Sequence, residues 1–331
     1  MAIPMTPPKA AGAFLIEAGW GGAEIVPLAG DASFRRYFRV MRGAETAVLM
    51  DAPPPHEDPR PFIHIAEYLA GIGLSAPRII HRDLDHGMLL IEDFGNERMR
   101  EAIYADPSCE AEMYRGVVDV LVALHQHLPP AGLKPHGLDA WLDEVELFTH
   151  WYCPAVGLAV DQQGFRSAWQ QVLSPIDKQG LSVTELRDFH AENIMLIDNA
   201  DGIGRFGLLD FQDALIGHPA YDLVSMLEDA RRDVTPAVET QMVAYYRQAT
   251  GKGASFDAAY WALGAQRNTR ILGVFTRLWQ RDNKPHYRQF QPRMWGLLDR
   301  NLAQPHLAPV KEWFDVNVPV TARAAAWADL P

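Results

Sequence analysis

The sequence predicts an α+β fold with two unequal lobes: a small N-terminal lobe built on an antiparallel sheet, and a larger lobe that is mainly helical. Short alternating segments typical of strands occur between residues 24 and 91, whereas apolar residues recur at helical spacing from residue 106 onward. The chain has 331 residues, which is longer than one ordinary compact domain. We therefore expect one lobe over residues 1–94 and the other over residues 95–331.

The small lobe is predicted to contain five strands and one helix. Alternation of apolar and polar side chains indicates the first two strands, and a turn at Arg42 and Gly43 separates the second strand from an apolar third. The prolines after Asp51 end the third strand, because proline cannot donate to the hydrogen-bond ladder of a sheet. The expected elements are strands at 24–28, 34–41 and 46–50, a helix at 59–70, and two strands flanking the turn 85–87, the second of them at 88–91.

Helical periodicity dominates the larger lobe, with one interruption. Two short apolar segments, at 194–197 and 206–210, are separated by a turn and predict a hairpin. Polar residues stand at the ends of this hairpin, and loops held by a rigid scaffold often carry chemistry. The expected helices lie near 113–128, 141–152, 162–177, 219–232, 235–249, 256–281 and 289–303.

Composition excludes several classes of function. The formal net charge is −12, which disfavours nucleic-acid binding through a basic face. No apolar run approaches the length of a membrane span, and no basic segment followed by an apolar stretch marks a signal peptide. Two cysteines are too few for a disulfide framework and suit a reducing compartment. We expect a cytoplasmic protein without nucleic-acid or membrane partners, and leave protein partners open.

The strongest chemical signal is the segment 186–193, which reads Leu-Arg-Asp-Phe-His-Ala-Glu-Asn and is followed by the hairpin. Phosphoryl transfer needs an oriented acceptor hydroxyl, a group that takes its proton, and magnesium to neutralise phosphate charge. Asp188 could serve the hydroxyl as the catalytic residue. Asn193, five positions later, and Asp210, at the end of the hairpin, offer the oxygen ligands that magnesium prefers. The pattern predicts a kinase with Asn193 and Asp210 as metal ligands.

The same segment resembles the Asp-x-His-x-x-Asn loop of aminoglycoside phosphotransferases and choline kinases, with His190 two positions after Asp188. Downstream, residues 216–223 resemble the Gly-x-Pro-x-x-Asp-Leu segment of that family, in which Asp222 is expected to anchor the catalytic loop. The resemblance covers nearly the whole chain. It implies a two-lobed protein-kinase-like fold, ATP as the phosphate donor and Mg²⁺ as the metal.

Nucleotide contacts follow from the resemblance by position. Residues 90–95 resemble the hinge of the family, in which the backbones of Glu92 and Phe94 would contact adenine. The loop after the first strand contains one glycine, as in the family, and would lie over the phosphates. The residues expected to contribute from this loop are Gly30, Asp31 and Ser33.

The small lobe departs from the kinase pattern at the lysine that grips the nucleotide phosphates. No lysine occurs between Lys9 and Lys134, so the small lobe cannot supply one. Arginine presents a fork of donors suited to phosphate, and Arg35 and Arg36 lie in the second strand. We favour Arg36 over Arg35 for the phosphate contact; the alternative is that both are ordinary solvated strand arginines.

The acceptor is expected near the catalytic loop, beside Arg187, His190, Asp213 and His218. This set includes a fixed cation, unlike the ring of carboxylates that a polycationic aminoglycoside needs. Residues 30–39 and 48–54 also resemble the bacterial sugar kinases that phosphorylate the anomeric hydroxyl of N-acetylmuramate and N-acetylglucosamine in cell-wall recycling. Such an amino sugar is the expected small-molecule acceptor. Two alternatives stay open: an aminoglycoside-modifying kinase, and a catalytically inactive kinase-like binding protein.

A substitution at Asp188 tests the predicted chemistry. Asp188→Asn is expected to leave the fold and ATP binding intact but to lower turnover by roughly 10²–10⁴, the range for losing a positioned general base. Steady-state phosphorylation rates, measured beside a nucleotide-binding titration, provide the comparison. Turnover within a few-fold of the parent protein would remove Asp188 from the mechanism.

Overall fold

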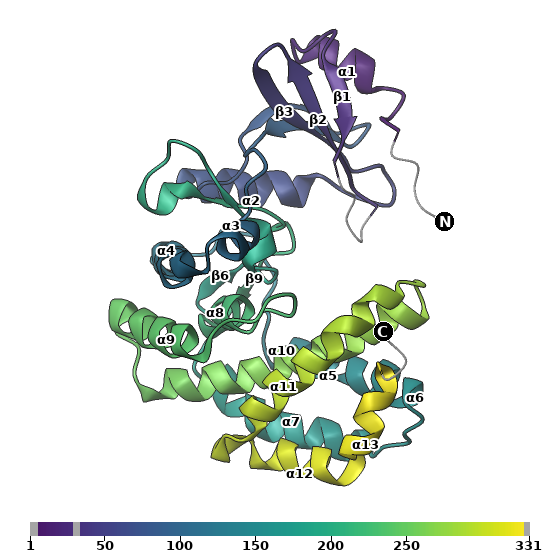
Figure 1. Cartoon of the computed structure of the whole chain (residues 1–331), viewed down its shortest axis with the longest axis vertical. Coiled ribbons are helices and arrows are strands. Elements are labelled where there is room, and N and C mark those ends of the chain that lie inside the picture. The colour runs from purple at the N-terminus through teal and green to yellow at the C-terminus, as the bar shows by residue number, and fades with distance from the viewer. Residues whose placement is uncertain (1–5, 29–33, 328–331) are drawn as a thin grey trace. The chain divides into compact units, whose positions relative to one another are not determined.

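The structure, a computed structural model, describes residues 6–28 and 34–327 of the chain (Figure 1). The chain folds into two compact units. The first contains residues 1–120 and 192–214, and the second contains residues 121–191 and 215–331. The antiparallel sheet and the many helices confirm the predicted α+β class. The division that the sequence suggests after residue 94 stays a prediction.

The first unit is built on a five-stranded antiparallel sheet in its described residues, as predicted. The strand order is β1-β2-β3-β5-β4, so β3 lies at the centre and is covered on both edges. Every residue of β3 from Ala47 to Asp51 is buried, which explains why this strand reads as a continuous apolar run. The strands are β1 (Glu24–Pro27), β2 (Arg36–Arg42), β3 (Glu45–Asp51), β4 (Ile79–Asp83) and β5 (Met88–Glu92).

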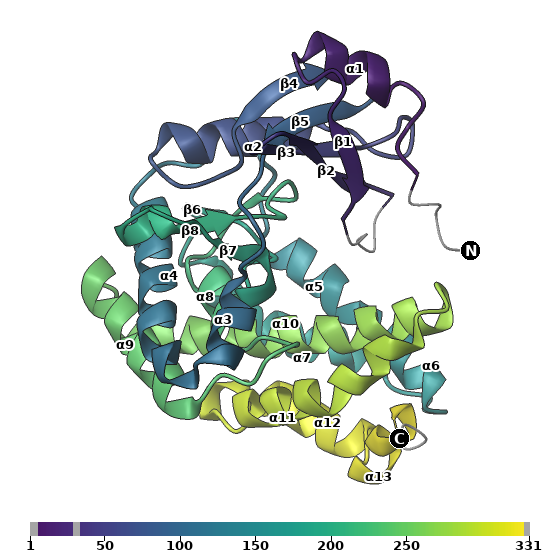
Figure 2. The ribbon, with the colours of Figure 1, turned by 45° about the horizontal axis from the view of Figure 1, so that its top comes forward.

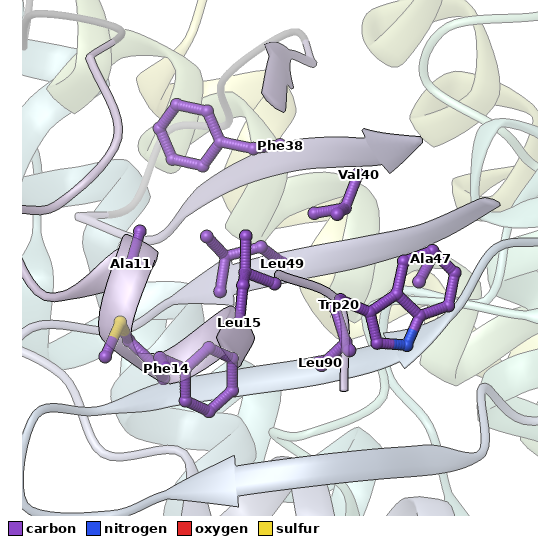
Figure 3. Packing of buried hydrophobic residues seen from close by; sticks show 10 residues of the cluster. Ala11, Phe14, Leu15, Trp20, Phe38, Val40, Ala47, Leu49 and Leu90 are labelled. Atoms are coloured by element: carbon purple, nitrogen blue, oxygen red, sulfur yellow. The ribbon is translucent and has the colours of Figure 1, made fainter. Parts of the chain in front are cut away.

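A short N-terminal helix, α1 (Ala11–Glu17), packs against this sheet and was not predicted. Figure 3 shows its buried side chains Phe14 and Leu15 in one cluster with the strand residues Phe38 and Leu49. Full burial of one such side chain contributes about 1.5–3 kcal/mol, so the contact stabilises the sheet face. A seven-residue helix offers too few apolar positions to establish a helical period in the sequence.

The predicted helix at 59–70 is present as α2 (Arg60–Gly71), which buries Phe62, Ile65 and Leu69. Its start differs by one residue from the prediction, because Pro59 precedes the first turn instead of opening it. Asp58 still caps this end, since its Oδ1 accepts the Arg60 N–H at 3.0 Å.

The predicted hairpin is present as β7 (Ile194–Leu196) and β8 (Phe206–Leu208), and it belongs to the first unit. Two backbone hydrogen bonds explain why the hairpin belongs to the first unit. The Leu208 N–H donates to the Ser75 carbonyl at 2.7 Å, and the Leu196 N–H donates to the Glu97 carbonyl at 2.8 Å. The helices α3 (Met99–Ala105) and α4 (Glu110–Leu124) lie in the same stretch of chain, although α4 ends in the second unit.

The second unit is mainly helical around α10 (Ala254–Gln280), which packs on α5, α8 and α11 (Figure 2). The predicted helix at 219–232 ends early, at Leu227, and two helices after residue 307 were not predicted. Apart from α10 the helices are α5 (Leu138–Leu147), α6 (Cys153–Ala155), α7 (Gln162–Asp177), α8 (Ala220–Leu227), α9 (Pro236–Thr250), α11 (Gln291–Leu302), α12 (Ala308–Asn317) and α13 (Val320–Arg323). A two-stranded ladder joins β6 (Val183–Glu185) to β9 (Leu215–Gly217).

The length and the apolar character of each helix decide whether it could cross a bilayer. Within residues 6–28 and 34–327, none combines the length and the apolar character that crossing a bilayer requires. Even α10, at 27 residues, carries several arginines along its length.

Two helical glycines of the second unit give a matched test of its packing. A Cβ at Gly273 of α10 would lie 2.4 Å from the Leu147 carbonyl carbon, whereas one at Gly296 of α11 would meet nothing within 4 Å. Gly273→Ala is therefore expected to destabilise the protein by about 1–3 kcal/mol through overpacking. Gly296→Ala is expected to be neutral or to stabilise by up to ~1 kcal/mol through helix propensity. Urea unfolding of both variants decides this, and equal effects would contradict the close approach of α10 to the end of α5.

Candidate active site

The two predicted metal ligands lie together in the first unit. Asn193 immediately precedes β7 and Asp210 follows β8, and the pairing of Ile194 with Leu208 places both at one end of the hairpin. The Asn193 Nδ2 atom is 3.4 Å from the Asp210 Oδ2 atom. Gln212 orients the same carboxylate by donating from Nε2 to Oδ1 at 2.8 Å. In its contact with Asp210 the Asn193 amide donates to the carboxylate, and the binding of Mg²⁺ by the two residues stays a prediction.

Asp210 sits in an unusual backbone conformation. Its φ is 59°, in the left-handed region that aspartate tolerates better than most residues. The next residue, Phe211, is buried and stacks on Phe62 of α2 with ring centroids 5.0 Å apart. Packing of Phe211 thus holds the backbone in this conformation and fixes the direction of the Asp210 carboxylate. Such retained strain is typical of functional positions.

The proposed hinge residues are placed by the sheet and by the hairpin. The Glu92 N–H donates to the Arg78 carbonyl at 2.9 Å and is therefore engaged within the first unit. The Phe94 ring lies over Gly207, where a Cβ would come within 2.6 Å of it. The glycine thus allows the hinge to pack directly on the hairpin that carries Asp210. Contacts of Glu92 and Phe94 with adenine stay predictions.

Arg36, the first residue of β2, and Arg35, which precedes the strand instead of lying in it as predicted, are both close to carboxylates of the first unit. Arg36 pairs with the buried Asp51 at the end of β3, with an Nε–Oδ2 distance of 2.8 Å. The Arg35 Nε atom lies 3.8 Å from the Glu57 Oε2 atom. These partners were not predicted, and a phosphate contact for either arginine stays a prediction. The loop residues Gly30, Asp31 and Ser33 lie outside the described part of the chain.

In the second unit, Asp222 anchors the catalytic loop as expected. Its carboxylate accepts the Leu186 N–H at 2.6 Å and the Arg187 N–H at 2.9 Å. From the next turn of α8, the Ser225 hydroxyl donates to the Arg187 carbonyl at 3.0 Å. These bonds hold Arg187 at a φ of 70°, again in the left-handed region. The strained turn immediately precedes Asp188 and so determines where that side chain starts.

Asp188 lies in a cationic environment. Burial alone would raise its pKa, but the charges of Arg270 and Arg267 on α10, together with Arg187, outweigh burial and hold the pKa below its usual range. Asp188 is therefore ionised at physiological pH. An ionised carboxylate can accept a hydrogen bond from an acceptor hydroxyl and, later, its proton.

A chain of buried ion pairs formed by Arg187, Glu144, His136 and Glu185 holds the catalytic loop in place. It was not predicted from the sequence. Arg187 forms an ion pair with Glu144 of α5. The His136 ring joins two carboxylates, with Nε2 3.1 Å from Glu144 Oε2 and Nδ1 2.7 Å from Glu185 Oε1. A Cβ at Gly217 would lie 2.0 Å from the Glu185 Oε2 atom, so the glycine leaves room for this carboxylate.

The charge of His136 follows from these two neighbours. Burial would lower its pKa, but Glu185 and Glu144 outweigh burial and raise the pKa to about 9. The imidazole is therefore a cation at neutral pH. The Glu144 carboxylate, which also meets Arg270 at 3.4 Å, has its pKa lowered by these cations despite burial.

The predicted acceptor residues are found in both units. In the second unit, His190 is buried and its Nε2 atom accepts from Arg231 at 3.1 Å, while the pKa of the ring is lowered to about 4, mainly by burial. His218 caps α8, because its Nδ1 atom accepts the Ala220 N–H at 3.2 Å. In the first unit, Asp213 is exposed and lies beside Gln212. Their contacts with an acceptor stay predictions.

The described residues contain no other obvious metal centre. Over residues 6–28 and 34–327, no three or more His, Cys, Asp or Glu side chains come together as a set of metal ligands.

The sheet, the hairpin and the anchored loop are the parts of a protein-kinase-like fold. A solved structure of a choline/ethanolamine kinase family protein from Mesorhizobium loti supports this class, with a TM-score of 0.63 at 17% identity over 92% of this chain and 97% of that one. The chain belongs to the phosphotransferase enzyme family, whose model matches residues 24–260.

Two relatives are similar in sequence to this chain over nearly their whole lengths. One, from Caulobacter vibrioides, is an N-acetylmuramate/N-acetylglucosamine kinase that is 35% identical over 94% of this chain and 96% of its own. The other has the same name, comes from Pseudomonas aeruginosa and is 36% identical over 89% of each chain. This chain therefore aligns with full-length members of one group of kinases.

The charge of His136 gives a pH-dependent test. A folded-state pKa of about 9, above the ordinary value of ~6.5, means that His136 stabilises the protein fully below pH ~6.5. This contribution, about 3 kcal/mol, is lost as the pH rises through about 9. In His136→Gln, urea unfolding should show lower stability at pH 6.5 and a smaller loss of stability between pH ~6.5 and ~9.5.

A second buried histidine provides the control. His125 is neutral, because burial lowers its pKa to about 3, and its Nδ1 atom contacts the Tyr246 hydroxyl. His125→Gln should lower stability but leave the alkaline loss unchanged. If His136→Gln keeps the full alkaline loss, the buried imidazolium is not its source.

Proposed function

We propose that this protein transfers the γ-phosphate of ATP to a hydroxyl of an amino sugar, N-acetylmuramate or N-acetylglucosamine. Membership of the phosphotransferase family supports the reaction, and the two named relatives support the substrate class. The structural observation that carries the choice is the cationic surrounding of Asp188, to which Arg267 and Arg270 contribute.

In the proposed mechanism, Asp188 orients the acceptor hydroxyl and accepts its proton, while the bond from the hydroxyl oxygen to the γ-phosphorus forms and the bond from that phosphorus to the departing ADP breaks. The anchoring of Arg187 by Asp222 supports this role, because it fixes the start of the Asp188 side chain. The low pKa of Asp188 makes it a weak base. Its main contribution is therefore to position the hydroxyl, and proton transfer comes late.

Asn193 and Asp210 are proposed to hold Mg²⁺. Their separation of 3.4 Å and the restraint of Asp210 by Gln212 support this assignment. When bound, the ion would neutralise charge on the transferred phosphate. The nucleotide is assigned to the first unit, with Glu92 and Phe94 toward adenine and Arg35 or Arg36 toward the phosphates. Both arginines have a carboxylate neighbour, but Arg36 is hydrogen-bonded to Asp51 at 2.8 Å whereas Arg35 lies 3.8 Å from Glu57, so the charge of Arg36 is the more strongly compensated.

Charge separates the proposed acceptor from an aminoglycoside. An aminoglycoside carries several positive charges, and its affinity depends on carboxylates around its rings. The side chains that act on Asp188 are cations instead, which suits the carboxylate of N-acetylmuramate. The formal net charge of −12 determines the electrostatic potential far from the protein. It does not change the cationic surroundings of Asp188.

The rival hypothesis of an inactive binding protein is less well supported. Retention of Asp188, Asn193 and Asp210 together argues against it, because a protein that only binds has no need of one residue for an acceptor hydroxyl and two for a metal ion. The similarity to the two amino-sugar kinases supports a further proposal, a role in cell-wall recycling in the cytoplasm, where ATP is available.

A panel of acceptors tests the proposal. Purified protein with ATP and Mg²⁺ should phosphorylate N-acetylglucosamine or N-acetylmuramate and leave kanamycin-type compounds and choline unchanged. Product analysis by phosphorus NMR should show a phosphate ester at the anomeric position. Asp188→Asn, run in parallel, controls for contaminating kinases. Efficient phosphorylation of an aminoglycoside with no turnover of either sugar would reverse the choice of acceptor, and absence of all turnover would favour the binding protein.

A further inference from the structure

A small cavity lies within the second unit, apart from the residues assigned to catalysis. Its volume is about 210 Å³, below the range of roughly 300–1,000 Å³ that drug-sized ligands occupy. Three loops surround it: the one after α7, the one before α8 and the one between α9 and α10. The lining residues are Gln179, Gly180, Ser182, His218, Pro219, Lys252, Ser255 and Phe256.

His218 supplies a buried donor to this cavity. The residue is only 3% exposed, and its Nδ1 atom accepts the Ala220 N–H. A neutral imidazole whose Nδ1 atom accepts must carry its proton on Nε2. The ring is neutral, because burial and the nearby Lys252 lower its pKa to about 4. Nε2 has no hydrogen-bond partner within residues 6–28 and 34–327, so an N–H donor remains available in the cavity wall.

Three further lining residues, Lys252, Ser182 and Ser255, carry donor groups. Lys252 is exposed and forms no ion pair with the residues that the structure describes. Ser182 and Ser255 bring hydroxyl groups, and none of the lining residues is acidic. A wall that combines a cation, an imidazole N–H and hydroxyls is complementary to an oxyanion.

The cavity also lies at the N-terminus of the longest helix. The helix α10 begins after Gly253, and no side chain caps its first turn. The exposed N–H groups of such a turn, with the positive end of the helix dipole, favour an anion. Asp257, the acid of that turn, is paired with Arg247 at 2.6 Å, which offsets its charge.

We propose that this cavity is a binding site for a phosphate dianion, either inorganic phosphate or the phosphate group of a small monoester. Lys252 and the α10 N-terminus would provide charge, while His218 Nε2 and the serine hydroxyls would direct the oxygens. The site is distinct from the catalytic one. Ser255 and Arg270, which acts on Asp188, are about 20 Å apart along α10 at 1.5 Å per residue. The inference does not depend on the identity of the acceptor, and it assigns His218 a role other than acceptor contact.

Calorimetric titration of the full chain with inorganic phosphate tests this site. A non-hydrolysable ATP analogue with Mg²⁺ should be present at saturation, so that phosphate does not enter the nucleotide site. The parent protein is expected to bind phosphate in the millimolar range or tighter. Lys252→Ala should weaken binding by about tenfold, the low end for loss of one charge-assisted contact. A second titration with glucose 1-phosphate distinguishes a monoester from the free ion by its higher affinity.

Two further variants separate binding from folding. Ser255→Asp places a negative charge in the first turn of α10, where it should abolish phosphate binding without lowering the melting temperature. His218→Asn can keep the acceptor for the Ala220 N–H while removing the Nε2 donor, so phosphate affinity should fall while α8 stays capped. Lys311→Ala, at an exposed lysine paired with Asp315, is the matched control and should bind like the parent.

Each outcome of these titrations either supports or contradicts the proposed phosphate site. Loss of affinity in Lys252→Ala and Ser255→Asp, with Lys311→Ala unchanged, supports the site. Absence of phosphate and monoester binding in the parent protein, or equal affinity in all four variants, overturns it. Failure of the sugar kinase assay would leave these titrations interpretable, because they require no turnover.

Discussion

The arrangement of the catalytic loop depends on one carboxylate, that of Asp222. It accepts two consecutive backbone N–H groups, from Leu186 and Arg187. These two hydrogen bonds favour the ionised carboxylate, although burial and the nearby Glu185 raise the pKa of Asp222 to about 8. They offset the cost of the left-handed conformation at Arg187, which in turn sets the start of Asp188. A side chain from α8 thus determines the geometry of a loop that is far away in the sequence.

The ionic chain beneath the loop adds a second restraint. Arg187, Glu144 and His136 alternate in charge, and Glu185 completes the series next to the loop. Each buried charge would be costly alone, but every neighbour in the series has the opposite sign. The chain connects β6, α5 and the loop, so the position of Asp188 depends on three separate segments of the second unit.

Local patterns in the sequence predicted the five strands, the hairpin and the loop anchor, because each depends on residues close together or on a recognisable motif. The pairing of Arg36 with Asp51 could also have been predicted from the sequence. A tight turn after Arg42 fixes the register, and counting back along both strands brings these residues opposite each other. The role of His136 was not predictable, because its partners Glu144 and Glu185 follow it by 8 and 49 positions and share no motif with it.

The buried imidazolium has a consequence for how this protein exchanges protons with its solvent. Between pH ~7 and ~8.5 the free histidine side chain is largely neutral, whereas His136 in the folded chain is charged. Folding in that range therefore takes up about one proton at this position. The heat measured on folding would include the ionisation heat of whatever buffer releases that proton, and would differ between phosphate and Tris solutions. The proton bound by His136 takes no part in the proposed reaction, yet the folded state binds it in a ratio of about one per chain.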